Sequence, residues 1–223
     1  MAIEPKEILE ELLAVSKGKT FDAILPPLVF VLANSLTALE YALILSVACG
    51  MLLGIRRLVR QQNALYALGG LLGVLAASGF ALLTRSAVGY FIPSLLGSAA
   101  LVLAAVISLA AGRPLAAWAS HLTRGWPLEW FWRPDVKPAY REVTWVWAVY
   151  FMARLVLLVV LFWLGDALRL AWINSLLGWP VTVLVLIFSY VYGIWRLRSL
   201  QGPGVDEYQA GKPAPWRGQT RGF

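Results

Sequence analysis

Residues 148–163 read AVYFMARLVLLVVLFW, an apolar run interrupted by one arginine, Arg154. The apolar segment extends over residues 144–165, long enough for an α-helix to cross the roughly 30 Å hydrocarbon core of a bilayer. A guanidinium stays charged at that depth, and its insertion costs about 2.5–3.5 kcal/mol. The stretch therefore predicts a transmembrane helix and marks Arg154 as a residue that needs a polar partner.

The composition of the whole chain is also that of a membrane protein. Of its 223 residues, 60% are hydrophobic and 14% are charged, and the mean hydropathy is +0.71. Soluble domains carry about 25% charged residues. One cysteine, Cys49, excludes an intramolecular disulfide, and one histidine, His121, has no Cys or His companions for a metal site. We expect no metal and no cofactor.

Six apolar segments predict an all-α fold with six transmembrane helices. The segments are 21–37, 39–55, 64–84, 90–111, 144–165 and 174–195. When both termini are placed in the cytoplasm, Arg85 and Arg169 lie on the outer side and almost all other Lys and Arg residues lie on the inner side. This bias predicts a multi-pass protein of the bacterial cytoplasmic (inner) membrane. It also accounts for the net charge of +7 without a nucleic-acid partner.

The predicted spans divide the chain into three regions. Residues 1–20 are an amphipathic N-terminal segment, expected to be a short helix on the membrane or on a partner; a solvated helix packed on the protein's own loops is the alternative. Residues 21–198 are the transmembrane domain, with a cytosolic loop at 113–142. Residues 199–223 are rich in Gly and Pro, which predicts an extended or disordered tail unless a partner orders it.

Internal repetition is suggested by three segments that begin alike. Residues 34–35, 93–94 and 174–175 read Asn-Ser, Pro-Ser and Asn-Ser, and each pair precedes an apolar run that ends at an arginine. Parallel repeats are common in transport proteins, so three helical-hairpin repeats are one interpretation. Chance is the other, because serine, leucine and a basic stop recur in any membrane protein.

Small residues at i, i+4 spacing predict which helices pack closely, because they let helix backbones approach one another. Three apolar segments carry such stripes: Ala42, Ser46, Gly50 and Gly54; Gly69, Gly73 and Ala77; and Ala100, Ala104, Ser108 and Gly112. We expect these helices to form the packed centre. The fifth segment has bulky aromatic residues and is expected at the periphery or against another protein.

The first two apolar segments offer Arg154 a partner. Too few residues separate Lys19 from Arg56 for two full crossings, so the turn between them is expected to stop below the outer surface. At 1.5 Å per residue, Asn34, Glu40 and Arg154 all reach about 20–24 Å above the inner boundary. The sequence thus predicts a buried Arg154–Glu40 pair with Asn34 nearby.

Two other interpretations of Arg154 stay open. The side chain can snorkel along its own helix or bond backbone carbonyls, with Tyr150 one turn below as a cation–π neighbour. Alternatively, Arg154, Glu40 and Asn34 form a layer that handles a substrate or an ion.

The cytosolic loop contains GWPLEWFWR, residues 125–133. Trp and Arg are favoured both at anionic lipid headgroups and at protein interfaces. We expect lipid or partner contacts from this loop and from the aromatic side chains of the fifth helix. The residues are Trp126, Trp130, Trp132, Arg133, Trp147 and Phe151.

Several runs in the chain resemble one family. LPPLVF (25–30), ALGGLLGVLAASGFALLTR (67–85), YFIPSLL (90–96), FWRPDVKPAYREVTWVWAVYFMARL (131–155) and LGWPVTVLVL (177–186) resemble the integral membrane family named domain of unknown function 3159. The resemblance covers about residues 21–195 and implies an integral membrane protein of a mainly actinobacterial family. It also implies that Arg154 belongs to the family pattern, and it transfers no activity. A more distant similarity links the chain to the intracellular septation protein family of small polytopic inner-membrane proteins.

The sequence contains no GxSxG, HExxH or P-loop motif. It therefore favours a non-enzymatic accessory or assembly subunit of a larger membrane complex. The expected partners are the lipid bilayer and either other membrane subunits or further copies of the chain. The alternative is a small transporter or channel-like protein that uses Arg154, Glu40 and Asn34. A membrane enzyme is a third interpretation, without a motif to support it.

Overall fold

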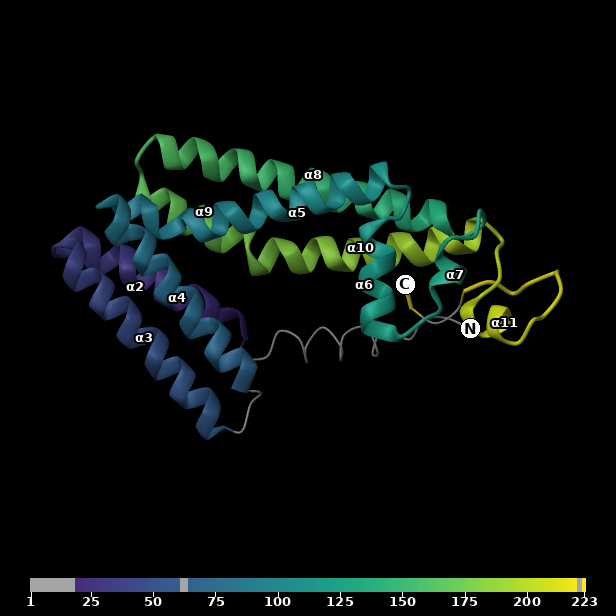
Figure 1. Ribbon diagram of the computed structural model, residues 1–223, viewed down its shortest axis with the longest axis horizontal. Helices are drawn as coiled ribbons and strands as arrows, with labels where there is room; N and C mark the ends of the chain where they lie inside the picture. The colour runs from purple at the N-terminus through teal and green to yellow at the C-terminus, as the bar shows by residue number, and fades with distance from the viewer. Residues whose placement is uncertain (1–18, 61–63, 220–221) are drawn as a thin grey trace. The chain divides into compact units, whose positions relative to one another are not determined.

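The computed structural model describes residues 19–60, 64–219 and 222–223, with side chains from residue 25 onward except for residues 64–67 (Figure 1). All regular structure within these residues is helical, which confirms the all-α prediction. The elements are α2 (Lys19–Leu36), α3 (Leu39–Val59), α4 (Ala64–Thr84), the 3₁₀ helix η1 (Ala87–Phe91), α5 (Ile92–Ala110), α6 (Leu115–Arg124), α7 (Leu128–Phe131), α8 (Lys137–Trp163), α9 (Ala167–Leu177), α10 (Trp179–Ser199) and α11 (Val205–Gln209). The predicted N-terminal segment lies outside the described residues except for the start of α2.

Four stretches of the described chain are long and apolar enough to cross a membrane. They are Leu39–Val59, Ala87–Ala110, Lys137–Trp163 and Ala167–Ser199. Two shorter apolar helices, Leu25–Leu36 and Leu68–Thr84, fall within α2 and α4. The sequence predicted six spans, and four of them meet the length requirement here. The six-span topology, the location of the termini and the repeats stay predictions.

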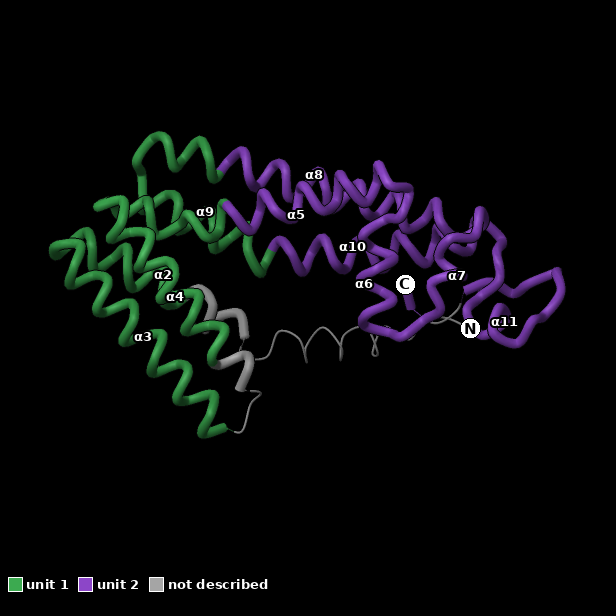
Figure 2. Tube along the Cα trace, viewed as in Figure 1, with its two compact units in different colours: residues 1–95, 158–180 green, residues 96–157, 181–223 purple. Residues whose placement is uncertain are grey.

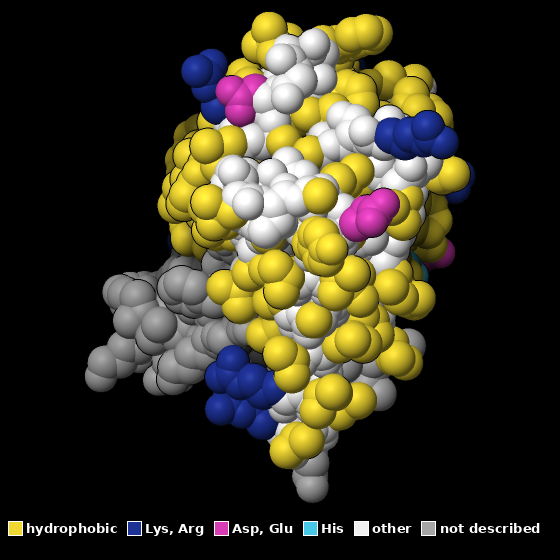
Figure 3. All heavy atoms as spheres, turned by 90° about the vertical axis from the view of Figure 1, so that its left-hand side faces the viewer, with side chains coloured by type: hydrophobic (Ala, Val, Ile, Leu, Met, Phe, Trp, Pro, Cys, Tyr) yellow, Lys and Arg dark blue, Asp and Glu magenta, His cyan; other side chains and the backbone are white. Residues whose placement is uncertain are grey.

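The chain divides into two compact units, which are described separately (Figure 2). Unit 1 contains the described residues up to Leu95 together with Leu158–Pro180, and unit 2 contains Leu96–Leu157 and Val181–Phe223. The surface shown in Figure 3 is largely hydrophobic, with a few charged side chains among the apolar ones. Ile44 on α3 and Leu83 on α4, for example, are 64% and 81% exposed. Large exposed apolar surfaces mark contact with a membrane or a partner, as the composition predicts.

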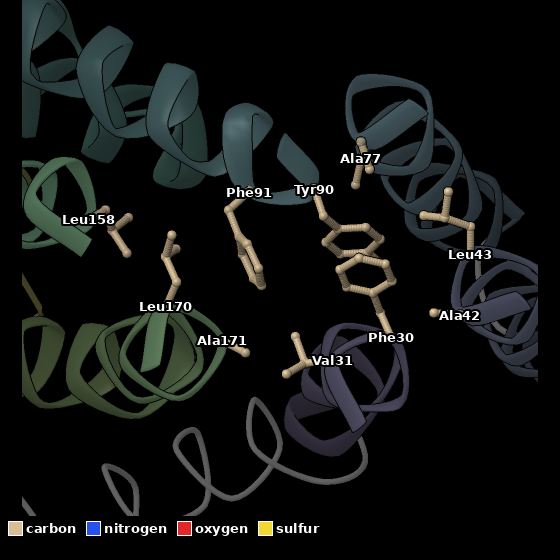
Figure 4. Packing of buried hydrophobic residues seen from close by; sticks show 11 residues of the cluster. Phe30, Val31, Ala42, Leu43, Ala77, Tyr90, Phe91, Leu158, Leu170 and Ala171 are labelled. Carbon is tan, nitrogen blue, oxygen red and sulfur yellow. The ribbon is translucent and has the colours of Figure 1, made fainter. Parts of the chain in front are cut away.

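The core of unit 1 is a cluster of aliphatic and aromatic side chains from α2, α3, α4, η1, the end of α8, and α9 (Figure 4). At its centre the rings of Phe30 and Tyr90 stack at 4.2 Å between centroids with an interplanar angle of 10°. The members are Phe30, Val31, Ala42, Leu43, Ala77, Ala81, Tyr90, Phe91, Leu158, Leu170 and Ala171.

A buried chain of hydrogen bonds crosses this core. The Ser46 hydroxyl on α3 donates to the Pro26 carbonyl on α2 at 3.2 Å, and the Tyr90 hydroxyl lies 2.8 Å from the same serine oxygen. Because serine has one proton, the Tyr90 hydroxyl donates to Ser46 when Ser46 donates to Pro26. The chain therefore links α2, α3 and η1 and satisfies two buried hydroxyls.

We expect Ser46→Ala to lower the free energy of unfolding by about 1–3 kcal/mol, because it leaves the buried Tyr90 hydroxyl without its partner. Tyr90→Phe should cost less, about 0.5–1.5 kcal/mol, because Ser46 keeps its bond to Pro26. Thermal unfolding in detergent measures both, with the exposed Ser35→Ala as the control, since its hydroxyl bonds the Leu32 carbonyl of its own helix. Equal losses for Ser46→Ala and Ser35→Ala would contradict the buried chain.

A glycine turn separates α8 from α9 within unit 1. Gly165 has φ +71°, a backbone conformation that side chains with a Cβ rarely adopt. Asp166 then caps α9, because its side chain accepts the Arg169 N–H at 2.9 Å and pairs with the Arg169 guanidinium at 3.1 Å. The positive φ of Gly165 and the cap formed by Asp166 thus lie where one helix ends and the next begins.

Candidate functional site

The cytosolic loop predicted at 113–142 is folded into α6, α7 and the first turns of α8, all in unit 2 (Figure 2). Gly112, with φ +66°, ends α5, and the Arg113 N–H bonds the Ser108 carbonyl at 2.9 Å. The Ser108 hydroxyl accepts the Leu115 N–H at 3.0 Å, and the Thr144 hydroxyl on α8 accepts the Ala116 N–H at 3.1 Å. Side chains of α5 and α8 therefore cap α6 and fix its start.

Unit 2 has its own aromatic core. Trp130, Phe131 and Tyr140 are fully buried, and the rings of Phe131 and Tyr140 meet edge to face at 4.9 Å. The Phe223 ring stacks on Tyr140 at 4.3 Å. It occupies the space beside Gly193 on α10, where any Cβ would overlap the ring. The glycine thus lets the end of the described chain pack between α8 and α10.

The tail beyond α10 is also docked on unit 2. The Trp130 indole N–H donates to the Pro203 carbonyl at 2.9 Å, and Gly202, Pro203, Gly204 and Val205 are buried. The sequence predicted an extended or disordered tail; the structure instead contains α11 and these contacts. Amino-acid composition could not have predicted these contacts, because Trp130 and Pro203 are 73 residues apart in the sequence.

One carboxylate organises the tail into a closed loop, residues 204–218. Glu207 on α11 accepts the N–H groups of Arg217 at 2.9 Å, Gly204 at 3.0 Å and Gly218 at 3.1 Å. The bonds from Arg217, Gly204 and Gly218 lower the pKa of the Glu207 carboxyl from its ordinary value of 4.5. Because the folded-state pKa is depressed, this carboxylate stabilises the docked tail above pH 4.5, and the contribution is lost as the pH falls through the folded-state pKa.

Acidification is therefore expected to loosen the tail below about pH 4.5. A nitroxide on Ala210→Cys, in a Cys49→Ala background, should show increasing mobility by electron paramagnetic resonance as the pH falls from 6 to 3. Glu207→Gln should already be mobile at pH 6, because the uncharged amide forms weaker bonds to the three N–H groups. Glu129→Gln, which removes an exposed carboxylate from the first turn of α7, is the control. A wild-type pH profile in the Glu207→Gln variant would contradict this role of Glu207.

The structure places the six predicted contact residues in two groups. Trp130 is fully buried and Phe151 is 9% exposed, so both side chains pack inside unit 2 rather than at its surface. The half-buried members are Trp126, Trp132, Arg133 and Trp147. The sequence alone does not show whether a tryptophan lies at an interface or in the core. Trp130 is buried because the tail covers it.

The half-buried tryptophans of the loop carry arginines on their ring faces. Arg124 lies over the Trp126 ring at 5.1 Å, and Arg113 lies over the Trp132 ring at 5.6 Å. Arg133 forms a bidentate pair with Asp135, at 2.9 and 2.7 Å, which raises the pKa of its guanidinium. These pairs give the loop a surface of partly exposed indole rings and guanidinium groups, suited to anionic or aromatic partners.

A second ion pair joins α8 to α10 and was not predicted from the sequence. The Arg196 guanidinium bonds both Glu142 oxygens, with its Nε 2.8 Å from Oε2 and its second terminal nitrogen 2.9 Å from Oε1, and the Tyr192 hydroxyl donates to Glu142 at 2.7 Å. In the sequence, the basic residue next to Glu142 is Arg141. The actual partner is 54 residues away, a separation at which sequence spacing carries no signal.

Arg154 lies half-buried on α8 in unit 2, with its Nε shielded from solvent. Its guanidinium interacts with the Tyr150 hydroxyl one turn below. That hydroxyl lies 2.7 Å from the Thr182 hydroxyl on α10. The neighbour named in the snorkelling interpretation is therefore present, with the contact made through its hydroxyl.

The other two members of the predicted polar layer lie in unit 1. Asn34 is half-buried near the end of α2, and Glu40 is exposed in the first turn of α3. The Arg154–Glu40 pair stays a prediction. Among the residues that the structure describes, no three His, Cys, Asp or Glu side chains gather in an arrangement that could hold a metal ion.

Comparison with known proteins gives one match. No curated protein and no solved structure matches the chain. A family described as "Protein of unknown function (DUF3159)" matches residues 18–198. This range includes three of the four candidate spans, the fourth up to its last residue but one, the loop of α6 and α7, and Arg154. It confirms the resemblance found in the sequence, and the chain belongs to this DUF3159 family.

Proposed function

We propose that this protein is a non-enzymatic, multi-pass protein of the bacterial cytoplasmic membrane that serves as an accessory or assembly subunit of a larger membrane complex. The observation that carries the proposal is the folded loop and tail of unit 2. Several of its charged groups bind one another or the backbone, as in Arg133–Asp135 and the Glu207 loop. Trp126 and Trp132 stay partly exposed. Such a surface suits recognition of a partner better than chemistry on a substrate.

The proposed topology has six crossings with both termini in the cytoplasm. Its support is the positive charge at one end of unit 2, where α5 ends, α8 begins and α10 ends. Arg113, Arg124, Lys137, Arg141 and Arg198 belong to these helix ends and to α6. Positively charged helix ends are retained on the cytoplasmic side, so we place this end of unit 2 inside the cell.

Purification from the native membrane in a mild detergent, followed by native mass spectrometry, tests the proposal. We expect the protein to emerge with other subunits in a fixed stoichiometry. The double variant Trp126→Ala/Trp132→Ala should lose these subunits while remaining folded, as checked by circular dichroism. Trp163→Ala, which removes an 82% exposed indole from the end of α8 in unit 1, is the control and should keep them. A wild-type protein that emerges alone or with copies of itself would contradict the accessory role.

A small transporter or channel-like protein is the second candidate. The observation in its favour is the polar chain inside the spans, from Arg154 through Tyr150 to Thr182. One such chain is a thin lining for a hydrophilic path, so we rank this function second. A protein that is pure, free of partners and active in a proteoliposome flux assay, with the flux lost in Arg154→Met, would favour it.

A further inference from the structure

Two cationic residues of unit 2 belong to the region where α5 ends and α8 begins, Arg113 in the turn after α5 and Lys137 at the start of α8. The ammonium group of Lys137, the first residue of α8, lies 3.3 Å from the position that a Cβ of Gly112 would occupy. The next residue in the α5–α6 turn is Arg113, which is exposed. The absence of a side chain at Gly112 therefore lets the lysine approach the turn that presents the arginine.

A pair of tryptophan rings lies beside Arg113. The Arg113 guanidinium lies over the Trp132 ring at 5.6 Å, and the Trp132 ring lies 6.0 Å from that of Trp118 on α6. Both indoles are half-buried. Indole rings favour the level of the headgroups and glycerol at a membrane surface, where one edge is wet and the rest is apolar.

The positive charge of this pair is not neutralised by the protein. The acidic residues nearest to Lys137 in the sequence pair with other arginines, Asp135 with Arg133 and Glu142 with Arg196. Neither Arg113 nor Lys137 forms an ion pair with any residue of the described chain. Both cationic groups therefore remain available to an anionic group that reaches the end of α5 and the start of α8.

We propose that Arg113 and Lys137 bind the phosphate of one anionic phospholipid headgroup, with Trp132 and Trp118 beside its glycerol. The inference rests on the proposed placement of this end of unit 2 at the inner face of the membrane. Apolar side chains of α5, such as Leu103 and Ile107, are 60% and 64% exposed and offer surface for the acyl chains. Basic clusters between membrane helices on the cytoplasmic side are suited to such headgroups.

The test measures phosphatidylglycerol retention by native mass spectrometry of detergent-purified protein, with phosphatidylcholine, which is zwitterionic and has no net charge, as the comparison. The variant Arg113→Gln/Lys137→Gln should bind phosphatidylglycerol about 30-fold more weakly, since each cation near an anionic lipid is worth about fivefold in affinity. Arg198→Gln/Lys212→Gln removes the same charge from exposed positions elsewhere in unit 2 and should bind as the wild type does. Arg113→Lys/Lys137→Arg keeps both charges and should keep most of the affinity.

The inference is overturned if the Arg113→Gln/Lys137→Gln variant binds phosphatidylglycerol as tightly as the wild type, if both charge-removing variants weaken binding equally, or if phosphatidylcholine binds as well. The charge-retaining variant Arg113→Lys/Lys137→Arg changes the same two side chains. If it still binds the lipid, the loss in the Arg113→Gln/Lys137→Gln variant is due to the missing charges and not to a disturbed fold. Lipid retention is measured on the purified protein itself, so the result does not depend on partner subunits. Lipid binding by a protein that purifies without partner subunits would therefore refute the accessory role and leave the lipid site standing.

Discussion

Trp130→Ala is expected to lower the free energy of unfolding by about 3–5 kcal/mol, the cost of deleting a large aromatic side chain from a packed core. Trp130 is fully buried, contacts the rings of Trp126, Phe131 and Tyr140, and donates its indole N–H to the Pro203 carbonyl. Its removal leaves a cavity under the tail and an unsatisfied buried carbonyl. Thermal unfolding in detergent and protease sensitivity of residues 201–219 should both report the loss.

Two further variants test how much of the stability loss of Trp130→Ala comes from the indole N–H and how much is specific to a buried tryptophan. Trp130→Phe keeps an aromatic ring and removes the N–H, so it should lose about 1–3 kcal/mol and release the tail at Pro203 first. Trp195→Ala removes a tryptophan that is 60% exposed on α10 and should change stability by less than about 1 kcal/mol in detergent. If Trp130→Ala and Trp195→Ala unfold at the same temperature, Trp130 is not a core residue and the tail does not depend on it.

The apolar helices were predictable because length and hydropathy alone define them. The predicted segment 64–84 coincides with α4, and the predicted segment 39–55 falls within α3. Helix α8 begins at Lys137, earlier than the predicted 144, because charged residues in its first turns resemble a loop in the sequence. The predicted segment 174–195 is split at Gly178, where a Cβ would lie 2.8 Å from the Asn174 carbonyl.

The spacing of small residues correctly predicted the packed face of α3 and only partly predicted that of α4. Ala42, Ser46 and Gly50 on α3 are buried, and a Cβ on Gly50 would lie 3.3 Å from Val74 of α4. On α4, however, Gly69 and Gly73 are exposed, with nothing within 4 Å of an added Cβ. Small residues permit close approach without choosing the partner, and the Val74 and Ala77 side of α4 provides the contact instead.

The site was less predictable than the spans, because its contacts join distant parts of the sequence. The aromatic loop was recognised as a contact surface, but its buried and exposed members were not separated. That separation depends on the tail, through the Trp130–Pro203 bond and the Tyr140–Phe223 stack. A Gly- and Pro-rich composition predicts a flexible tail on average, and the Glu207 bonds to three N–H groups are specific to its fold.

The second large effect is expected at Arg154. If Arg154 and Glu40 form the predicted pair, Glu40→Gln leaves an uncompensated guanidinium in the membrane and Arg154→Met leaves an uncompensated carboxylate. Loss of one partner from a buried pair costs about 3–5 kcal/mol. The double variant Arg154→Met/Glu40→Gln removes both charges and should recover most of the lost stability, because a buried pair replaced by uncharged groups is often close to neutral.

Thermal unfolding in lipid nanodiscs, which keep both side chains at their membrane depth, measures the coupling between them. Because the double variant is expected to be close to neutral, it should be more stable than the sum of the two single losses predicts by about 6–10 kcal/mol, the sum of two losses of about 3–5 kcal/mol each. Arg169→Met, at an arginine whose side chain is 74% exposed in its pair with Asp166, should cost less than about 1 kcal/mol.

If the stability losses of Arg154→Met and Glu40→Gln are additive, the predicted Arg154–Glu40 pair is refuted. The local contact with Tyr150 then becomes the explanation of how Arg154 is held, and Tyr150→Phe should couple to Arg154→Met by about 0.5–3 kcal/mol. Because Tyr150 also contacts Thr182, this second result would tie the buried arginine to the α8–α10 contact inside unit 2. The two cycles together therefore distinguish an arginine that stabilises the first hairpin from one that is held by its own helix and its neighbour α10.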